Sequence, residues 1–440
     1  MKHLGLIAAL LFLVSCSGID FRYSEEFPDI FPDYVGVTIP EGMNCPNFRM
    51  SDRRKFKFSE ERQGDTLWIK VSAWKKGEKS GTSYKAFPIY IIKDEIDPYI
   101  AYRLIEPGYE SWNDMGIWQR ELASFDEKPI VTNKANNKGC VNCHTFDSKN
   151  PDRFLFHARG AGGGTVFIDG EKARLLNLAT VGPGKQGTYP AWHPSGRYVA
   201  FSSNTTNQCF TVSDAQPIEV YDTSSDLIIM DLETDEITAD PRFCTEETLE
   251  TFPGWSEDGN TLYYCAAENK ENIHLNRGEV HYKIMSIGFK DGQFTGEPHT
   301  VWEDENASAS FPRINGKYLL FTKSSFGTFP IWHREADLCL LDLETGETRS
   351  ADELNSPDTE SYHSWSSNGR WIIFSSRRLD GRYTRLFLAH FDGEGHFSKP
   401  FLLPQKDPDD NTLRLKSYNI PEFIAGDASG RQSSIKSLFK

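Results

Sequence analysis

The sequence is short of positive charge. Among its 440 residues, 48 are Lys or Arg and 63 are Asp or Glu, so the formal net charge is −15. Proteins that bind phosphate-rich polymers need a basic surface. The chain offers only short basic runs such as Arg53-Arg54-Lys55. We therefore expect no nucleic-acid partner.

Long hydrophobic runs are also scarce. The run Leu4–Val14 is too short for the roughly 20 residues that a membrane-spanning helix needs. It follows Lys2 and His3 and ends at Leu13-Val14-Ser15-Cys16, which is typical of an export signal. This ending resembles the bacterial lipobox, in which the chain is cut before the cysteine and the thiol is lipidated.

The alternative is an ordinary secretory signal followed by an incidental cysteine. We favour the lipoprotein reading, with residues 1–15 as signal peptide and Cys16 as the lipid anchor. The mature chain is then expected in the cell envelope, at the outer membrane or facing the periplasm.

Paired cysteines are rare as well. Eight cysteines include a single Cys-x-x-Cys, in Cys140-Val141-Asn142-Cys143-His144. This is the attachment signal of a c-type haem. A structural zinc site needs four ligands and usually a second cysteine pair. A thioredoxin-like redox pair needs a βαβ context, whereas an Asn-rich loop precedes this motif. We predict one covalent haem c on Cys140 and Cys143, with His144 as the proximal iron ligand.

The sixth iron ligand stays open. His157 lies soon after the motif, Met115 lies before it, and a haem without a sixth protein ligand is the third option. Ligation by two histidines gives a lower reduction potential than ligation by His and Met. A single motif indicates a mono-haem protein.

Once Cys16, Cys140 and Cys143 are assigned, the five remaining cysteines are Cys45, Cys209, Cys244, Cys265 and Cys339. Their number is odd, so at least one stays unpaired within the chain. Cys209 and Cys244 lie in loop-like stretches and are candidates for a disulfide in an oxidising compartment. Cys265 and Cys339 sit inside strand patterns and are expected to be buried small hydrophobes.

Aromatic residues are abundant, with 10 Trp, 17 Tyr and 30 Phe, which favours β structure. Beyond about residue 160 a strand–turn–strand pattern recurs four times. The copies begin at Tyr189, Phe252, Phe311 and Tyr362, and each has a glycine in its turn. The spacing of about 50 to 63 residues suits a four-stranded propeller blade.

These repeats resemble the TolB-type propeller. The likeness is carried by Trp192, Trp255 and Trp365, with Ile314 in place of the Trp in the third copy. The resemblance implies a mainly β chain with a propeller of five or six blades. Thr165–Leu178 would supply a further blade, and Ser417–Phe423 a closing strand.

Strand patterns at Thr66–Val71 and Phe87–Ile92 predict a small β-rich domain, and a short helix is predicted over Asn113–Leu122. The predicted domain organisation is a signal peptide (1–15), an N-terminal β-rich domain (16–130), a loop-rich c-type haem segment (131–160), the propeller (161–424) and a disordered tail (425–440).

The fourth repeat has His363 where the other three copies have a proline. With His193 and His333 it could line one mouth of the propeller, as a metal or substrate site. The alternative is three scattered surface histidines.

The whole chain is similar to a group of TolB-like propeller lipoproteins of Bacteroidetes-type bacteria that carry a Cys-x-x-Cys-His before the blades. The segments that carry this likeness are Tyr102–Glu110, the haem motif, Ser361–Trp371 and Ser417–Phe423. The resemblance brings no activity with it.

Three functions compete. The first is haem-dependent electron transfer, with the propeller as a docking platform for an envelope protein partner. The second is an enzyme, either a haem redox catalyst or a propeller enzyme. The third is a TolB-like scaffold with a structural haem. No nucleophile elbow or paired-carboxylate signature is present, so catalytic residues remain unassigned.

Overall fold

The structure is a computed structural model that describes residues 18–44, 46–106, 114–160, 162–178, 186–210 and 218–439. The predicted signal peptide, Cys16 and Cys45 lie outside the described residues. The chain forms two compact units: unit 1 holds residues 1–36 and 48–90, and unit 2 holds residues 37–47 and 91–440. No helix within the described ranges is long and apolar enough to cross a membrane.

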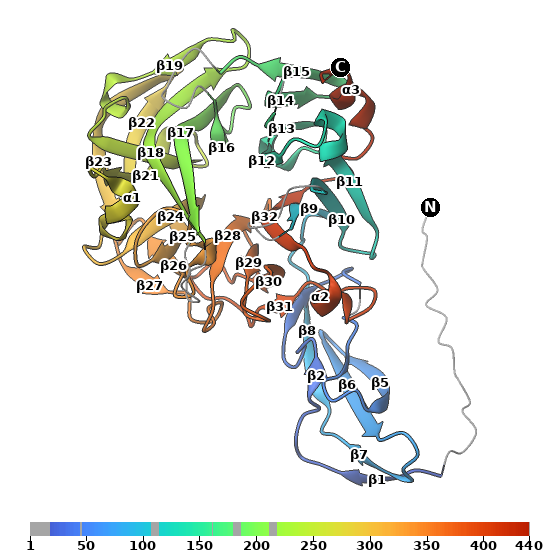
Figure 1. The fold of residues 1–440 in the computed structure, drawn as a ribbon. Helices are drawn as coiled ribbons and strands as arrows, with labels where there is room; N and C mark the ends of the chain where they lie inside the picture. Colours follow the sequence, from blue (N-terminus) through green and yellow to red (C-terminus); the bar gives the residue numbers. More distant parts are fainter. Residues whose placement is uncertain are drawn as a thin grey trace. The chain divides into compact units, whose positions relative to one another are not determined.

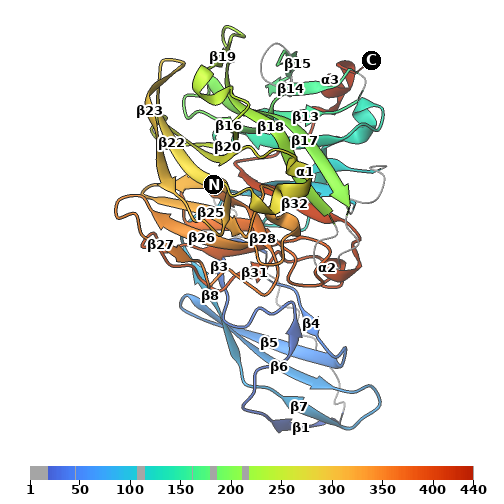
Figure 2. The same cartoon turned by 60° about the vertical axis from the view of Figure 1, so that its left-hand side comes forward.

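Unit 1 is a small β-sheet unit. Its strands are β1 (Asp20–Tyr23), β2 (Ile30–Phe31), β4 (Arg49–Met50), β5 (Lys55–Gln63), β6 (Thr66–Trp74), β7 (Ser80–Ser83) and β8 (Phe87–Ile92). Strands β5, β7 and β8 all pair with β6 (Figure 2), and β2 pairs with β4. Buried Ile69, Val71 and Ala73 alternate along β6 with more exposed residues, as expected for a strand with one covered face. The two strands predicted from the sequence are confirmed as β6 and β8.

Unit 2 is built from antiparallel groups of four strands, which we call ring units. Four of them are separate sheets: β9 (Tyr99–Ile105), β10 (Gly116–Glu121) and β11 (Glu127–Thr132) with β32 (Ser417–Ile424); β12 (Val141–Phe146), β13 (Arg153–Ala158), β14 (Gly164–Asp169) and β15 (Lys172–Leu176); β24 (Ser308–Asn315), β25 (Tyr318–Ser324), β26 (Asp337–Asp342) and β27 (Thr348–Ser350); and β28 (Glu360–Trp365), β29 (Trp371–Ser376), β30 (Arg385–His390) and β31 (Phe401–Leu402).

An eight-stranded sheet contains two further units. They are β16 (Thr188–Trp192), β17 (Tyr198–Phe210), β18 (Ile218–Asp231) and β19 (Ile237–Ala239), followed by β20 (Thr248–Trp255), β21 (Thr261–Glu268), β22 (Lys283–Lys290) and β23 (Gln293–Trp302). A single parallel pair, Ser225 with Leu249, joins the two halves.

These units are arranged around a ring, as Figure 1 shows. The first strand of each unit along the ring, in the order β12, β16, β20, β24, β28 and β32, contacts the next, and β32 also contacts β12. Strand β32 pairs antiparallel with β9, so the end of the chain completes a sheet that β9–β11 began. This mainly β, propeller-like arrangement confirms the predicted fold class in its general form, and the predicted closing strand is confirmed.

Helices are few and short. They are the 3-10 helices η1 (Asn133–Asn136), η2 (Asp147–Lys149), η3 (Pro241–Phe243), η4 (Arg277–Glu279) and η5 (Pro330–Trp332), and the α-helices α1 (Ile273–Asn276), α2 (Asp410–Leu413) and α3 (Gln432–Ser437). Strand β3 (Thr38–Pro40) also belongs to unit 2.

The inner strand of every ring unit carries the same irregularity. Its pairing register shifts by an extra residue, and one residue at the shift has a positive φ. These residues are Cys143 (50°), Tyr189 (49°), Phe252 (51°), Phe311 (56°), Tyr362 (51°) and Ile420 (53°). A β-bulge of this kind bends the strand and re-aims a side chain. We call these six residues the waist.

The repeat tryptophans connect neighbouring units. The indole Nε1 of Trp192 donates to the Thr145 carbonyl at 3.3 Å, and that of Trp255 donates to the Ala191 carbonyl at 3.1 Å. Trp365 donates in the same way to the preceding unit, to the Arg313 carbonyl at 3.2 Å. The repeated tryptophan is therefore a structural link between units.

The structure divides the chain differently from the sequence-based domains. The boundaries predicted near residues 130 and 160 both fall inside unit 2, because β9–β11 pair with β32 and because β12 and β13 share a sheet with β14 and β15. The segment 131–160, expected to be loop-rich, therefore contains the two paired strands β12 and β13.

Two further predictions need correction. The helix predicted over Asn113–Leu122 is instead strand β10, which pairs with β9 on one side and β11 on the other. The tail predicted to be disordered contains α3, and its Ile435 is fully buried against Ile424 and Ala428. Tertiary pairing and packing decide both segments, and neither is visible in local sequence.

Candidate functional site

The Cys-x-x-Cys-His motif lies on the inner strand β12. Its second cysteine, Cys143, is a waist residue, and His144 follows at the position that His363 holds on β28. The Thr145 carbonyl accepts a hydrogen bond from the Trp192 indole, as the Ala191 and Arg313 carbonyls accept one from a repeat tryptophan of the next ring unit. The motif is thus built into the repeating frame of the ring and does not precede it.

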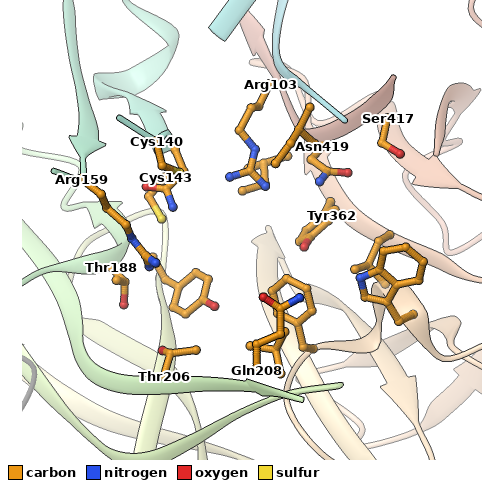
Figure 3. Close-up of a pocket in the computed structure, with 18 of the residues that line it drawn as sticks. Arg103, Cys140, Cys143, Arg159, Thr188, Thr206, Gln208, Tyr362, Ser417 and Asn419 are labelled. Atoms are coloured by element: carbon orange, nitrogen blue, oxygen red, sulfur yellow. The ribbon is translucent and has the colours of Figure 1, made fainter. Parts of the chain in front are cut away.

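The two thiols of the motif share one cavity. Cys140 and Cys143 line a cavity of about 340 Å³, and both are buried. Figure 3 shows them on the same wall, with Arg159 beside them and Tyr362 across the space. Burial raises the pKa of Cys140, so its sulfur is a neutral thiol at neutral pH.

A second cavity of about 640 Å³ adjoins the first. Four waist residues, Cys143, Tyr189, Tyr362 and Ile420, line both cavities, and His144 lines the second. Because their walls come from inner strands of several units, the two cavities lie along the axis of the ring.

His144 is buried without a well-formed hydrogen bond. Its side chain is 3% exposed, and neither ring nitrogen meets hydrogen-bond geometry with a described residue, although weaker contacts with the backbone of Ile420 and Ala101 raise its pKa. Burial, with a contribution from Arg103, lowers the pKa of His144 to about 3. The imidazole is therefore neutral, which is the form that binds a metal.

His363 shows what a purely structural histidine does at the same repeat position. Its Nε2 lies 2.9 Å from the Leu320 carbonyl of the preceding unit and bonds to it. His144 has only weaker contacts of the same kind, with the backbone of Ala101 and Ile420, which hold the places of Leu320 and Phe311 around His363. The two histidines therefore have equivalent surroundings, and His144 differs in lacking a well-formed hydrogen bond.

The residues present fit a covalent haem. Two buried thiols face one cavity, and the buried neutral imidazole of His144, which follows the second thiol directly, lines the adjoining cavity. Cys140 and Cys143 would hold the macrocycle by thioether bonds and His144 would be the protein donor to iron. The bound group would supply a one-electron redox centre.

The two candidates for the sixth ligand lie close to the motif but outside both cavities. His157 on β13 pairs with Asn142 of the motif strand; its Nδ1 is 3.3 Å from the Thr165 hydroxyl, and burial lowers its pKa to about 4. Met115 is 2% exposed and belongs to the hydrophobic cluster that contains Cys140. Neither residue lines either cavity, and the sixth ligand stays a prediction.

The three histidines proposed for a propeller-mouth site do not come together. His193 Nε2 bonds to the Gly259 carbonyl at 3.0 Å, His363 bonds to Leu320, and His333 Nε2 lies 2.9 Å from a Glu219 carboxylate oxygen. Within the described ranges, no group of three His, Cys, Asp or Glu side chains could hold a metal ion. Each of the three histidines has a separate local partner, so this site hypothesis is not supported.

The contact between His333 and Glu219 holds a long hairpin. Glu219 lies on β18, which with β17 forms a hairpin that extends across the ring in Figure 1. Residues of this hairpin, among them Thr206 and Gln208, line the thiol cavity. Burial alone would lower the pKa of His333, but Glu219 and Glu335 raise it to about 9. The buried His333 is therefore protonated at neutral pH and forms an ion pair.

The cysteine predictions have mixed outcomes. Cys209 and Cys244 are both free thiols, so the disulfide proposed between them is wrong. Cys209 is on β17, whereas Cys244 follows η3 and bonds to Asp226. Cys265 and Cys339 are buried within strands, as predicted.

Sequence reasoning missed the arginines of the thiol cavity. Arg103, Arg159 and Arg377 all line it, from β9, from the residue after β13 and from the residue after β29. They are far apart in the chain, and the ring topology is what brings them together. Only the position of Arg159, shortly after the haem motif, offered a local signal.

Comparison with known proteins gives distant likenesses only. No family model matches the chain, and no curated protein matches it. Among solved structures, an oligogalacturonate lyase in complex with manganese is similar at 14% identity and a TM-score of 0.40, over 69% of this chain and 73% of that one.

Two other solved structures lie at a comparable distance. An oligogalacturonate lyase from Vibrio parahaemolyticus shares 10% identity at a TM-score of 0.39, over 80% of this chain and 85% of that one. The tricorn protease shares 12% identity at a TM-score of 0.40, over 86% of this chain and 36% of that one. Likenesses this remote say nothing about activity.

Proposed function

We propose that this chain is an exported mono-haem c lipoprotein that transfers electrons, with its haem attached at Cys140 and Cys143 inside the ring. The observation that carries the proposal is the pair of thiols on one cavity wall, followed directly by the buried neutral imidazole of His144 on the wall of the adjoining cavity. The lipobox-like segment ending at Cys16 supports the site of action, because c-type haem is attached outside the inner membrane.

The finer fold assignment belongs to this proposal. The six waist residues and the three tryptophan links are what a six-bladed TolB-type propeller would repeat. In this interpretation the ring is the platform on which a redox partner of the envelope docks.

A second function is favoured by one observation. No histidine or methionine lies among the described residues that line the thiol cavity; the polar groups there include Tyr189, Tyr362 and three arginines. His144 lines only the adjoining cavity, so a haem bound to it would meet no second histidine or methionine on the thiol-cavity side, which suits binding or conversion of a small molecule at iron.

The optical spectrum of the purified haem protein separates these two functions. Electron transfer predicts a low-spin, six-coordinate spectrum that carbon monoxide does not change. Ligand chemistry predicts a five-coordinate iron that binds carbon monoxide. A His157→Ala variant is the matched control. If the His157 ring stays bonded to Thr165, the spectrum of this variant should equal that of the wild type. A loss of low-spin character would instead assign His157 as the sixth ligand.

A further inference from the structure

The thiol cavity concentrates positive charge in a strongly acidic protein. Three guanidinium groups line it, from Arg103, Arg159 and Arg377, whereas Glu106 is the single carboxylate on its described walls. The whole chain has a net charge of −15. A cluster of cations at this place is therefore not a consequence of overall composition.

Two of these arginines have no ionic partner within the described residues. Arg103 is 9% exposed, and the Nε atoms of Arg103 and Arg159 are buried without a hydrogen-bond acceptor. The amide oxygen of Asn419, oriented to satisfy its neighbours, lies 3.3 Å from Nη2 of Arg103. Burying a charge without a counter-charge is costly, and no described carboxylate forms an ion pair with either of these two arginines.

The third arginine is held by an aromatic ring. The Arg377 guanidinium carbon lies 3.4 Å from the centre of the Trp332 ring, which fixes it by a cation–π contact. Trp332 and its neighbours Phe329 and Ile331 also line the cavity. The walls thus combine fixed cations with a broad apolar and aromatic face.

Figure 3 shows how the charges lie around the space. Arg103 and Arg159 reach into it from different units, with Cys143 between them. A guanidinium presents a planar fork of donors that matches a carboxylate, often with two parallel hydrogen bonds. An apolar ligand with carboxylate groups would fit both features of the cavity.

We propose that this cavity is a carboxylate-binding site, in which Arg103 and Arg159, assisted by Arg377, hold the acidic groups of an otherwise apolar ligand. The identity of the ligand rests on the proposed function: if that function holds, the acidic groups are the two propionates of the attached haem. The other source of the same chemistry is a free organic acid that enters the ring.

The test uses the full chain with Cys140→Ala and Cys143→Ala, in which binding is reversible. The probes are haemin, haemin dimethyl ester, whose propionates are masked, and glutarate, which has two carboxylates and no porphyrin. A charge-assisted contact is worth about 1.5–3 kcal/mol, so haemin should bind about 10-fold tighter than its ester or more. Arg103→Gln with Arg159→Gln should weaken haemin to the affinity of the ester and leave the ester unchanged.

Arg382→Gln, at an exposed arginine of the same unit, is the matched control and should change nothing. Equal affinity for haemin and ester, or no binding of any probe, overturns the carboxylate site. If glutarate binds in an Arg103-dependent way and haemin does not bind, the carboxylate site is supported and haem is rejected as its occupant.

A second measurement covers a failure of the cysteine variant to fold. In the haem-loaded chain, Arg103→Gln with Arg159→Gln should lower the midpoint potential, since cations near the haem disfavour its oxidised form. An unchanged potential in a chain that still carries covalent haem rejects the carboxylate site and leaves the proposed function standing.

Discussion

At the scale of single residues, the repeat position after the waist holds a histidine in two ring units. His363 forms a hydrogen bond there, whereas His144 has no well-formed one. The sequence showed both histidines but not their equivalence, because Cys143 replaces the aromatic residue that begins the other copies. The Cys-x-x-Cys-His pattern is visible in the sequence alone, whereas its place in the ring required the structure.

The ion pair of His333 with Glu219 predicts a pH dependence of stability. A rise of the pKa from 6.5 to about 9 is worth ~3 kcal/mol. Since the folded-state pKa is raised, this stabilisation is fully present below about pH 6.5 and is lost as the pH rises through about 9. Urea denaturation at several pH values should show that His333→Gln loses most stability near pH 6 and little above pH 9.5.

His299→Gln is the control for this experiment, because His299 is exposed and forms no ion pair with a described residue. It should leave the pH profile of the wild type intact. A His333→Gln penalty that stays constant from pH 6 to pH 10 would show that the ring is neutral and only packs.

The indole bonds between units are also a residue-scale prediction. Trp255→Phe removes the bond to the Ala191 carbonyl and part of a buried side chain. A lost hydrogen bond costs about 1 kcal/mol net and the lost volume adds to it. The thermal midpoint should therefore fall.

Trp302→Phe is the matched control, since the half-buried indole of Trp302 bonds to no described residue. An equal fall of the thermal midpoint in both variants would contradict a specific role for the hydrogen bond.

At the scale of elements, β32 and α3 carry most of what the sequence concealed. The closing strand was predicted from Ser417–Phe423, but its partner β9 lies about 300 residues earlier in the chain. Local pattern cannot identify a partner at that distance, so β9–β11 were assigned to a separate domain. The same pairing turned the expected helix at Asn113–Leu122 into β10, because β9 and β11 flank it.

The C-terminal helix offers a direct test of this element. Ile435 of α3 is fully buried against the hydrophobic cluster that contains Ile424 and Phe146. Ile435→Ala should lower the free energy of unfolding by about 2–5 kcal/mol, the usual cost of such a truncation in a core. Lys436→Ala, at the exposed neighbour, should be nearly silent. If both variants match the wild type in chemical denaturation, residues 425–440 are a tail without structure.

At the scale of the whole molecule, the strand that carries the Cys-x-x-Cys-His motif takes part in closing the ring. The first and last sheets of the ring meet at β12 and β32, and Glu422 of β32 accepts from the Phe146 backbone N–H at 3.2 Å. The motif strand β12 is therefore part of the closure of the ring.

The measurement that tests the central claim most directly is the intact mass of the purified protein, expressed with the haem maturation machinery. The wild-type chain should carry the mass of one haem that survives denaturation, and its absorption spectrum should show the haem band. The variant with Cys140→Ala and Cys143→Ala should lack the added mass and still fold. A wild-type chain that folds and is exported but carries no covalent haem would contradict the account.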